Sequence, residues 1–241
     1  MNLSRREFFV AGLGMMAAGC STQSILSTAR PGPAWPVLPY RPRATDPRNQ
    51  EPPARSGIRP APSWTKAAAK LPRIAHRSQW TRAKPTQRLL NRMGPIKRIT
   101  AHHEGSKPVY FSDQAATIQR LEAIRRYHAQ ERHWGDIGYH YVVDRAGFVW
   151  AARDVRYQGA HVKGHNENNL GIMVLGNFNE QAPSSEQYAT LESLLLILMH
   201  RYNVPGQRVH THRELTPGRT ECPGRTLQQH MIRLRRSGRL S

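Results

Sequence analysis

The chain divides into segments by the way apolar and polar residues are distributed along it. Residues 8–19 form a short uncharged run, and residues 31–62 hold ten of the 18 prolines. Proline removes backbone hydrogen-bond donors and favours extended chain, so the second of these segments does not form a regular core. We expect a semi-rigid spacer over residues 21–73, with a proline-rich ligand for another domain as the alternative. The folded domain is expected over residues 74–241.

The predicted elements of this domain alternate between strands and helices. Apolar or alternating runs indicate strands, and apolar residues three or four positions apart indicate helices. Ser112-Asp113 and a capping-box pattern at residues 184–187 mark two helix starts, and a last, basic helix is expected from about Thr226. Strands mixed with helices predict an α/β domain with one central sheet. The expected strands cover residues 96–101, 139–143, 148–152, 170–175 and 209–210.

Charge and composition narrow the class of protein. With 36 Lys and Arg against 16 Asp and Glu, the formal charge is +20, which suggests nucleic acid, an anionic membrane surface or an anionic polymer as a partner. The mean hydropathy of −0.65 excludes a polytopic membrane protein. Two cysteines exclude a disulfide-dense scaffold and a four-cysteine zinc site. All twelve histidines lie at or after His76, so the chemistry is expected in the C-terminal two-thirds.

The first twenty residues have the features of an export signal. Residues 4–9, Ser-Arg-Arg-Glu-Phe-Phe, resemble a bacterial twin-arginine signal, and residues 17–20 resemble the end of a lipoprotein signal, with Cys20 as the acylated residue. The uncharged run is too short to span a bilayer. By resemblance to lipoproteins, Ser21 in place of Asp favours a lipid anchor in the outer membrane, facing the periplasm. The alternatives are a short buried helix and cleavage after Ala29, which would give a soluble periplasmic form.

One thiol and two histidines suggest a metal site. Cys222 is the single thiol beyond residue 20, His212 lies ten residues before it, and His102 lies at the end of an expected strand. Zinc binds Cys and His, and a catalytic zinc site keeps one of its four positions open. A structural cysteine and a thiol nucleophile remain the alternatives on spacing alone. His103 is an alternative ligand to His102, because neighbouring strand residues point to opposite faces.

Several short motifs are spread over the folded domain. They are Arg-Ser-Gln-Trp at residues 77–80, Ile-Thr-Ala-His-His at 99–103, Gly-Tyr-His-Tyr at 138–141, Gly-Ala-His-Val-Lys-Gly-His-Asn at 159–166, Leu-Gly-Ile at 170–172, Gly-Asn-Phe at 176–178, His-Arg-Glu at 212–214 and Cys-Pro-Gly at 222–224. Together, over about residues 74–230, they resemble the zinc-dependent N-acetylmuramoyl-L-alanine amidases of type 2, whose fold is shared with the peptidoglycan recognition proteins. The resemblance implies an α/β fold with a central mixed β-sheet flanked by helices.

The resemblance also implies a role for individual residues. Met173 stands where the cytosolic anhydro-muropeptide amidases have a Glu, so that strand supplies no carboxylate base. The other positions correspond to ligands of one Zn²⁺ ion, to catalytic residues and to residues of the substrate groove. The implied zinc ligands are His102, His212 and Cys222; the implied catalytic residues are Tyr139 and Thr220; the implied substrate-binding residues are His161, Asn166 and His103.

The function that follows from the resemblance is hydrolysis of peptidoglycan. We expect zinc-activated water to cleave the amide bond between N-acetylmuramic acid and L-alanine of the stem peptide. The expected partners are peptidoglycan or muropeptides and, through the lipid anchor on Cys20, a membrane; the protein is expected to be a monomer. A non-catalytic peptidoglycan-binding receptor or tether is the alternative. Nucleic acid is not expected as a partner, because the export signal argues against it and no aromatic-basic motif is present.

Overall fold

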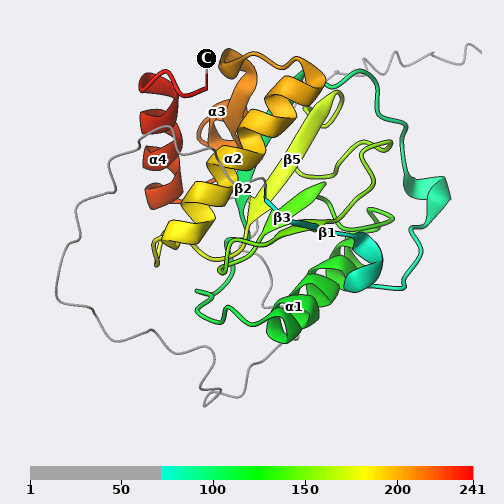
Figure 1. Ribbon diagram of the computed structural model, residues 1–241. Helices are drawn as coiled ribbons and strands as arrows, with labels where there is room; N and C mark the ends of the chain where they lie inside the picture. The colour runs from blue at the N-terminus through cyan, green and yellow to red at the C-terminus, as the bar shows by residue number, and fades with distance from the viewer. Residues whose placement is uncertain (1–71, 241) are drawn as a thin grey trace, which may run out of the picture.

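The computed structural model describes residues 72–240, which fold around one six-stranded sheet (Figure 1). The expected export signal, Cys20 and nearly all of the expected spacer lie outside the described residues. The strand order is β1-β4-β3-β5-β2-β6; β3 and β4 are antiparallel, and all other neighbours are parallel. The mixed sheet expected from the motifs is therefore confirmed. The strands are β1 (Ile74–Ala75), β2 (Arg98–His103), β3 (Tyr141–Val143), β4 (Val149–Ala151), β5 (Asn169–Val174) and β6 (Val209–Thr211).

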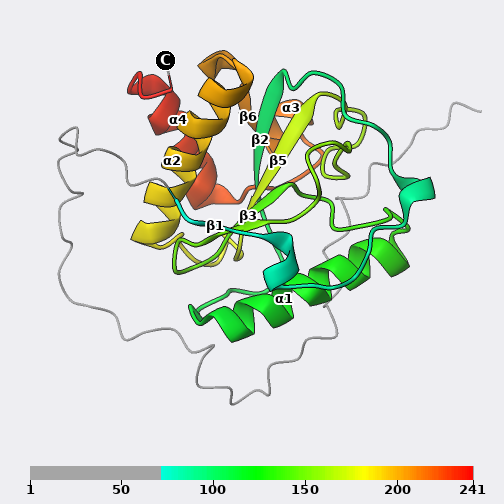
Figure 2. The same ribbon diagram turned by 45° about the vertical axis from the view of Figure 1, so that its right-hand side comes forward.

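Helices cover both faces of the sheet. Figures 1 and 2 show α2 and α4 on one face and α1 on the other. A five-residue π-helical segment, Tyr127–Glu131, continues α1. In the described part of the chain, single turns of 3-10 helix lie at Arg77–Gln79, Gln87–Leu89 and Gly206–Arg208. No helix within residues 72–240 is both long and apolar enough to cross a bilayer. The α-helices are α1 (Gln114–Arg126), α2 (Ser185–Tyr202), α3 (His212–Leu215) and α4 (Arg225–Arg236).

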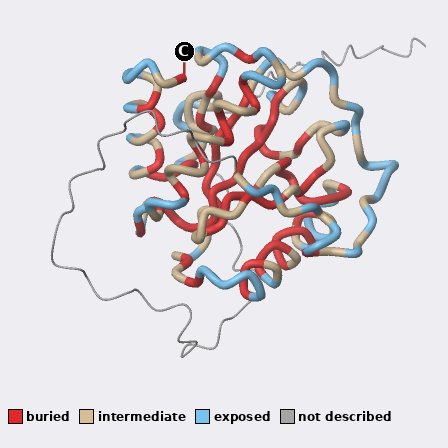
Figure 3. Tube along the Cα trace, viewed as in Figure 1, coloured by how far each residue is buried: buried red, intermediate tan, exposed pale blue. Residues whose placement is uncertain are grey.

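The two faces of the sheet carry two separate hydrophobic clusters. Because side chains alternate along a strand, Ile172 of β5 packs in the cluster of α2 and α4, whereas the adjacent Met173 packs in the cluster of α1. All six residues of β5 are buried, as expected for a parallel strand with helices on both sides. The buried residues run through the middle of the domain in Figure 3. The sheet is thus held rigidly, and β2 and β5 can position side chains at their ends.

The sequence located most elements, but not all of their ends. The capping box at the start of α2 is confirmed, since Ser184 Oγ accepts the Gln187 N–H at 3.0 Å and Gln187 Oε1 accepts the Ser184 N–H at 3.1 Å. The strand expected over residues 139–143 is shorter, because Tyr139 and His140 precede β3. The sequence did not predict β1 or the short helix α3, which are too brief to produce a periodic pattern.

Candidate metal centre

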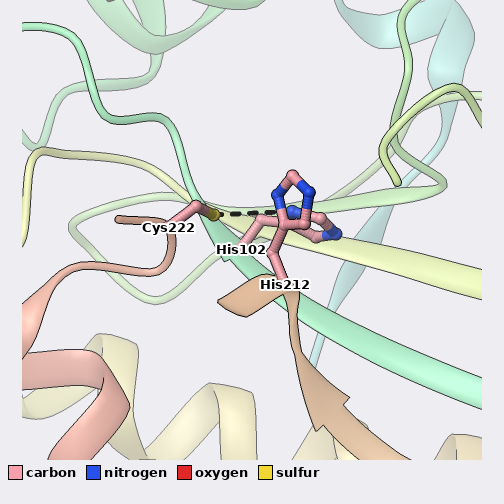
Figure 4. A group of neighbouring side chains, drawn as sticks. All are labelled: His102, His212 and Cys222. Carbon is pink, nitrogen blue, oxygen red and sulfur yellow. Dashed lines mark hydrogen bonds between the residues drawn. The ribbon is translucent and has the colours of Figure 1, made fainter. Parts of the chain in front are cut away.

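Three side chains from distant parts of the chain meet at one end of the sheet. His102 lies near the end of β2, His212 is the first residue of α3, and Cys222 lies in the loop between α3 and α4. One ligand atom from each residue lies within 4.8 Å of the other two (Figure 4). The structure therefore brings together the three residues expected to bind a metal, and they could hold one ion.

Strand register explains why the two histidines meet. β2 and β6 are parallel neighbours, and Ala101 pairs with Thr211. The next residue on each strand is a histidine, so His102 and His212 leave the same edge of the sheet side by side. Their ring centroids are 4.8 Å apart. The pairing of two strands thus fixes the positions of the two histidines.

The loop after α3 returns Cys222 to these histidines. The Arg213 N–H donates to the Cys222 carbonyl oxygen at 2.9 Å, and the Cys222 N–H donates to Thr220 Oγ1 at 3.1 Å. Cys222 Sγ then lies 3.5 Å from His102 Nδ1 (Figure 4). Thr220, expected to be catalytic, is therefore adjacent to the candidate ligands and supports the backbone of one of them.

Burial sets the protonation of the three candidate ligands. Burial, and then the neighbouring His212, hold the pKa of His102 well below its usual value. Burial also lowers the pKa of His212 to about 4 and raises the pKa of the Cys222 thiol to about 12. Both imidazoles are therefore neutral near pH 7 and keep a lone pair, and a bound cation would be needed to favour the thiolate. Two imidazole nitrogens and one sulfur form a donor set that fits a transition-metal ion rather than Mg²⁺ or Ca²⁺.

His103 lies on the other face of β2. Its Nδ1 accepts the Phe178 N–H at 3.2 Å, and its ring packs at 6.1 Å from the Phe178 ring. Only 4% of its surface is exposed. The structure therefore selects His102, not His103, as the histidine of this pair that faces His212 and Cys222. The expected contact of His103 with substrate stays a prediction.

Tyr139 lies beside the candidate ligands. Its ring centroid is 5.2 Å from that of His102, and its side chain is buried. Burial, and then the charges of Cys222 and Glu104, raise the pKa of Tyr139 well above its usual value. Its hydroxyl therefore keeps its proton over the physiological range and can act as a hydrogen-bond donor.

His161 and Asn166 take part in contacts within the protein. His161 Nδ1 lies 3.0 Å from His102 Nε2, and its Nε2 lies 3.2 Å from the Asn169 carbonyl oxygen. Asn166 Oδ1 accepts the backbone N–H groups of His161 at 2.9 Å and of Val162 at 2.8 Å. The structure thus places His161 against a candidate ligand and Asn166 under the loop that carries His161. Their expected contacts with substrate stay predictions.

A carboxylate whose position the sequence did not predict, Glu104, lies near the site. Glu104 is two residues beyond His102, is 4% exposed, and forms an ion pair with Arg120 of α1. Its Oε1 accepts a hydrogen bond from Ser106 Oγ at 2.6 Å, whereas no hydrogen-bond partner of Oε2 is present within residues 72–240. It lines a small pocket together with Tyr139 and Met173. The two-residue spacing from His102 could have signalled that both side chains share one face of the strand.

Comparison with known families agrees with this geometry. The model of the Amidase_2 family, described as N-acetylmuramoyl-L-alanine amidase, matches residues 92–225, which include all three candidate ligands. The chain belongs to the Amidase_2 family. His102, His212 and Cys222 thus all lie within the segment that the family model matches.

Similar proteins carry two kinds of name. Human N-acetylmuramoyl-L-alanine amidase is 29% identical over 181 residues, which cover 74% of this chain and 31% of the human protein. Peptidoglycan-recognition protein SC2 from Drosophila simulans is 32% identical over 152 residues, or 63% of this chain and 80% of that protein. The structure of peptidoglycan recognition protein-LE in complex with tracheal cytotoxin, a monomeric diaminopimelic acid-type peptidoglycan, has a TM-score of 0.60 and 25% identity, covering 66% of this chain and 92% of that chain. The match thus spans about a third of the human enzyme and most of the two recognition proteins.

Proposed function

We propose that this protein is a zinc-dependent N-acetylmuramoyl-L-alanine amidase that acts as a monomer on peptidoglycan or muropeptides. The observation that carries the proposal is the complete set of His102, His212 and Cys222, whose ligand atoms lie within 4.8 Å of one another. A peptidoglycan substrate is supported by the family and by the names of both kinds of relative. The bond to be cleaved is the amide between N-acetylmuramic acid and L-alanine.

The donor set supports zinc as the ion. Zn²⁺ is bound by Cys and His in tetrahedral sites, and three protein ligands leave the fourth position for the reaction. When bound, Zn²⁺ supplies Lewis-acid activation of the amide carbonyl and lowers the pKa of water. His102 and His212 are already neutral at pH 7 because they are buried, so they need not lose a proton to bind the ion.

Tyr139 is the residue that we assign to the developing negative charge. Attack on an amide places charge on the carbonyl oxygen, and a preorganised donor in a dry site stabilises that charge more than water does. The raised pKa of Tyr139 keeps its hydroxyl protonated, and its ring is buried beside the candidate ligand His102. Thr220 orients the Cys222 backbone through the hydrogen bond that it accepts. In the proposed reaction Tyr139 donates a hydrogen bond and Thr220 orients a candidate ligand.

The test is the release of stem peptides from purified peptidoglycan. We expect mass spectrometry to detect free stem peptides and intact glycan strands with the zinc-loaded full-length protein. Chelation of the metal, and the Cys222→Ser variant, should each reduce release by at least about 100-fold, which corresponds to roughly 2.7 kcal/mol in the barrier. The Cys20→Ser variant is the matched control, because it replaces the other cysteine of the chain but leaves the candidate ligands intact.

Two results would overturn the proposal in different ways. Equal release by metal-free protein would exclude a metal-dependent reaction. Tight binding of muropeptides by the zinc-loaded protein without any release would indicate a non-catalytic receptor or tether.

We further propose that the protein is exported to the periplasm and anchored to the outer membrane. The sequence supports this with the paired Arg5-Arg6, the short uncharged run and Cys20. Replacing both arginines with lysine should block export, and Cys20→Ser should release the protein from the membrane fraction. Unchanged fractionation of both variants would refute the proposed route and anchor.

A further inference from the structure

A line of three hydrogen-bonded groups leads away from the candidate metal site. His102 presents Nδ1 toward Cys222 Sγ and Nε2 toward His161, where the Nε2–Nδ1 distance is 3.0 Å. His161 in turn presents its Nε2 to the backbone carbonyl of Asn169 at 3.2 Å. Both ring nitrogens of His161 therefore have hydrogen-bond partners inside the protein. The line ends on the Asn169 carbonyl, which can only accept a hydrogen bond.

The carbonyl at the end of the line determines where each proton lies. A carbonyl oxygen only accepts hydrogen bonds, so His161 must carry its proton on Nε2. The residue His161 is only 7% exposed, and no carboxylate within residues 72–240 hydrogen-bonds to its ring, so the neutral form, with an unprotonated Nδ1, is favoured. That nitrogen accepts from His102 Nε2–H. The remaining nitrogen of His102, Nδ1, is then left with a lone pair directed to the side of Cys222.

We infer that His161 is a positioning residue, which fixes the tautomer and the ring orientation of His102 so that Nδ1 is available to the metal. Histidine ligands of metals generally donate their other N–H to an acceptor that orients them. That acceptor is usually a carboxylate, a backbone carbonyl or water, and here a second neutral imidazole takes its place. The inference rests on the metal site proposed above, but it concerns metal affinity and proton position rather than turnover.

The surroundings of His161 hold its ring in one orientation. A Cβ atom on Gly159 would lie 2.3 Å from His161 Cδ2, and one on Gly171 would lie 2.6 Å from the same atom. Both positions therefore need glycine to make room for the imidazole. Asn166 fixes the backbone on the other side, through the N–H groups of His161 and Val162. A ring confined in this way cannot turn to exchange its two nitrogens.

A neighbouring histidine provides the matched control. His140 is also buried, at 1% exposure, and both of its ring nitrogens are bonded to backbone: Nδ1 accepts the Gly171 N–H at 2.9 Å and Nε2 donates to the Tyr157 carbonyl at 3.0 Å. Its ring makes no hydrogen bond with His102. Removing His140 therefore costs the fold two hydrogen bonds, one of them buried, without touching the candidate ligand directly.

The experiment measures zinc affinity of the full-length protein by competition with a chromophoric chelator. We expect His161→Leu to raise the zinc dissociation constant by about 10–100-fold, the usual effect of losing such a partner. His161→Asn should recover much of this loss, because its side-chain oxygen can take the place of Nδ1 as the acceptor. His140→Leu should lower the melting temperature but change zinc affinity by less than about 3-fold. The inference would be overturned if His161→Leu bound zinc as tightly as the wild type, or if His140→Leu lost as much zinc affinity as His161→Leu.

A second measurement needs neither a variant nor zinc. Long-range ¹⁵N–¹H correlation spectra of the zinc-free wild type report which nitrogen of each histidine carries the proton. We expect the Nε2–H form for both His102 and His161. A predominant Nδ1–H form of His102 would refute the inference, whatever the outcome of the amidase assay. Failure of the amidase assay with the expected tautomers and affinities would instead refute only the proposed reaction.

Discussion

Replacing Gly171 with alanine tests the packing around His161, because the structure and general backbone preferences predict opposite changes in stability. Gly171 lies in the middle of β5, pairs with Thr100 of β2, and its φ is outside the left-handed region. At such a position Gly→Ala commonly stabilises a protein by about 0.4–1 kcal/mol, because alanine restricts the unfolded chain. The structure predicts the opposite sign at this residue.

The magnitude follows from the contacts of the added methyl group. The Cβ atom would lie 2.6–2.8 Å from three atoms of the His161 ring, Cδ2, Cγ and Nε2. The strand cannot move away easily, because the Gly171 N–H and carbonyl both hydrogen-bond to His140, at 2.9 Å each. Overpacking of a buried site costs about 1–3 kcal/mol, which exceeds the gain from restricting the unfolded chain. We therefore expect a net loss of about 1–2 kcal/mol.

Chemical denaturation of the zinc-free protein and a double-mutant cycle provide the assay. In the His161→Ala background the ring is absent, so adding Gly171→Ala should cost nothing or stabilise slightly. The coupling between the two changes should reach at least about 1 kcal/mol, as for residues in direct contact. Zinc affinity should fall in Gly171→Ala as well, because a displaced His161 loses its bond to His102. A neutral or stabilising Gly171→Ala with a coupling near zero would refute the reasoning.

Three further changes test other parts of the domain by denaturation. Ser184→Ala should lower the unfolding free energy by about 1 kcal/mol through loss of the α2 cap, and an unchanged value would contradict the role of the capping box. Arg120→Met should lower the free energy of unfolding by about 3–5 kcal/mol, because it removes the ion-pair partner of the buried Glu104. Adding Glu104→Gln should recover part of this loss. A loss below about 1 kcal/mol would mean that the ion pair is not needed for stability. Burial, and then the charges of Arg153 and Arg132, lower the pKa of His128 to about 3, below its value of about 6.5 in the unfolded chain. The contribution of neutral His128 to the free energy of unfolding is therefore present above pH 6.5 and is lost as the pH falls toward 3. Between pH 6.5 and 5.0 the free energy of unfolding should fall by about 1–2 kcal/mol, and His128→Phe should remove that part of the pH dependence in the zinc-free protein; identical pH profiles would contradict this.

The three candidate ligands could be predicted because they lie in recognisable motifs, and two of them lie at or just after the ends of recognisable strands. The apolar run around Ile99 ends on His102, and the short strand at Val209 ends just before His212, so two strand ends carry a histidine each. The sequence did not show that these strands are neighbours, because parallel pairing between distant segments has no local signal. The resemblance to known amidases instead grouped His102, His212 and Cys222 as ligands without giving the strand pairing.

The surroundings of the ligands could not be predicted in the same way. The bond between His102 and His161 joins residues 59 positions apart, and its direction depends on the Asn169 carbonyl, which any residue would provide. The sequence identified His161 by its motif but assigned it to the substrate groove. Similarly, nothing in the sequence pairs Glu104 with Arg120 of α1, because helical patterns specify a buried face but not the residue that it meets.

The position of β2 in the sheet has a consequence for how the protein is made. Ile99 of this strand pairs with Leu170 on one side and with Val209 on the other, and both partners are synthesised after it. Until they emerge, both edges of β2 lack their hydrogen-bonding partners, and unpaired edges of apolar strands favour association between chains. Pairings between distant segments also form slowly. Among the strands within residues 72–240, residues 98–103 therefore wait longest for their last neighbour, and a chaperone that covers this segment during synthesis should reduce association between chains.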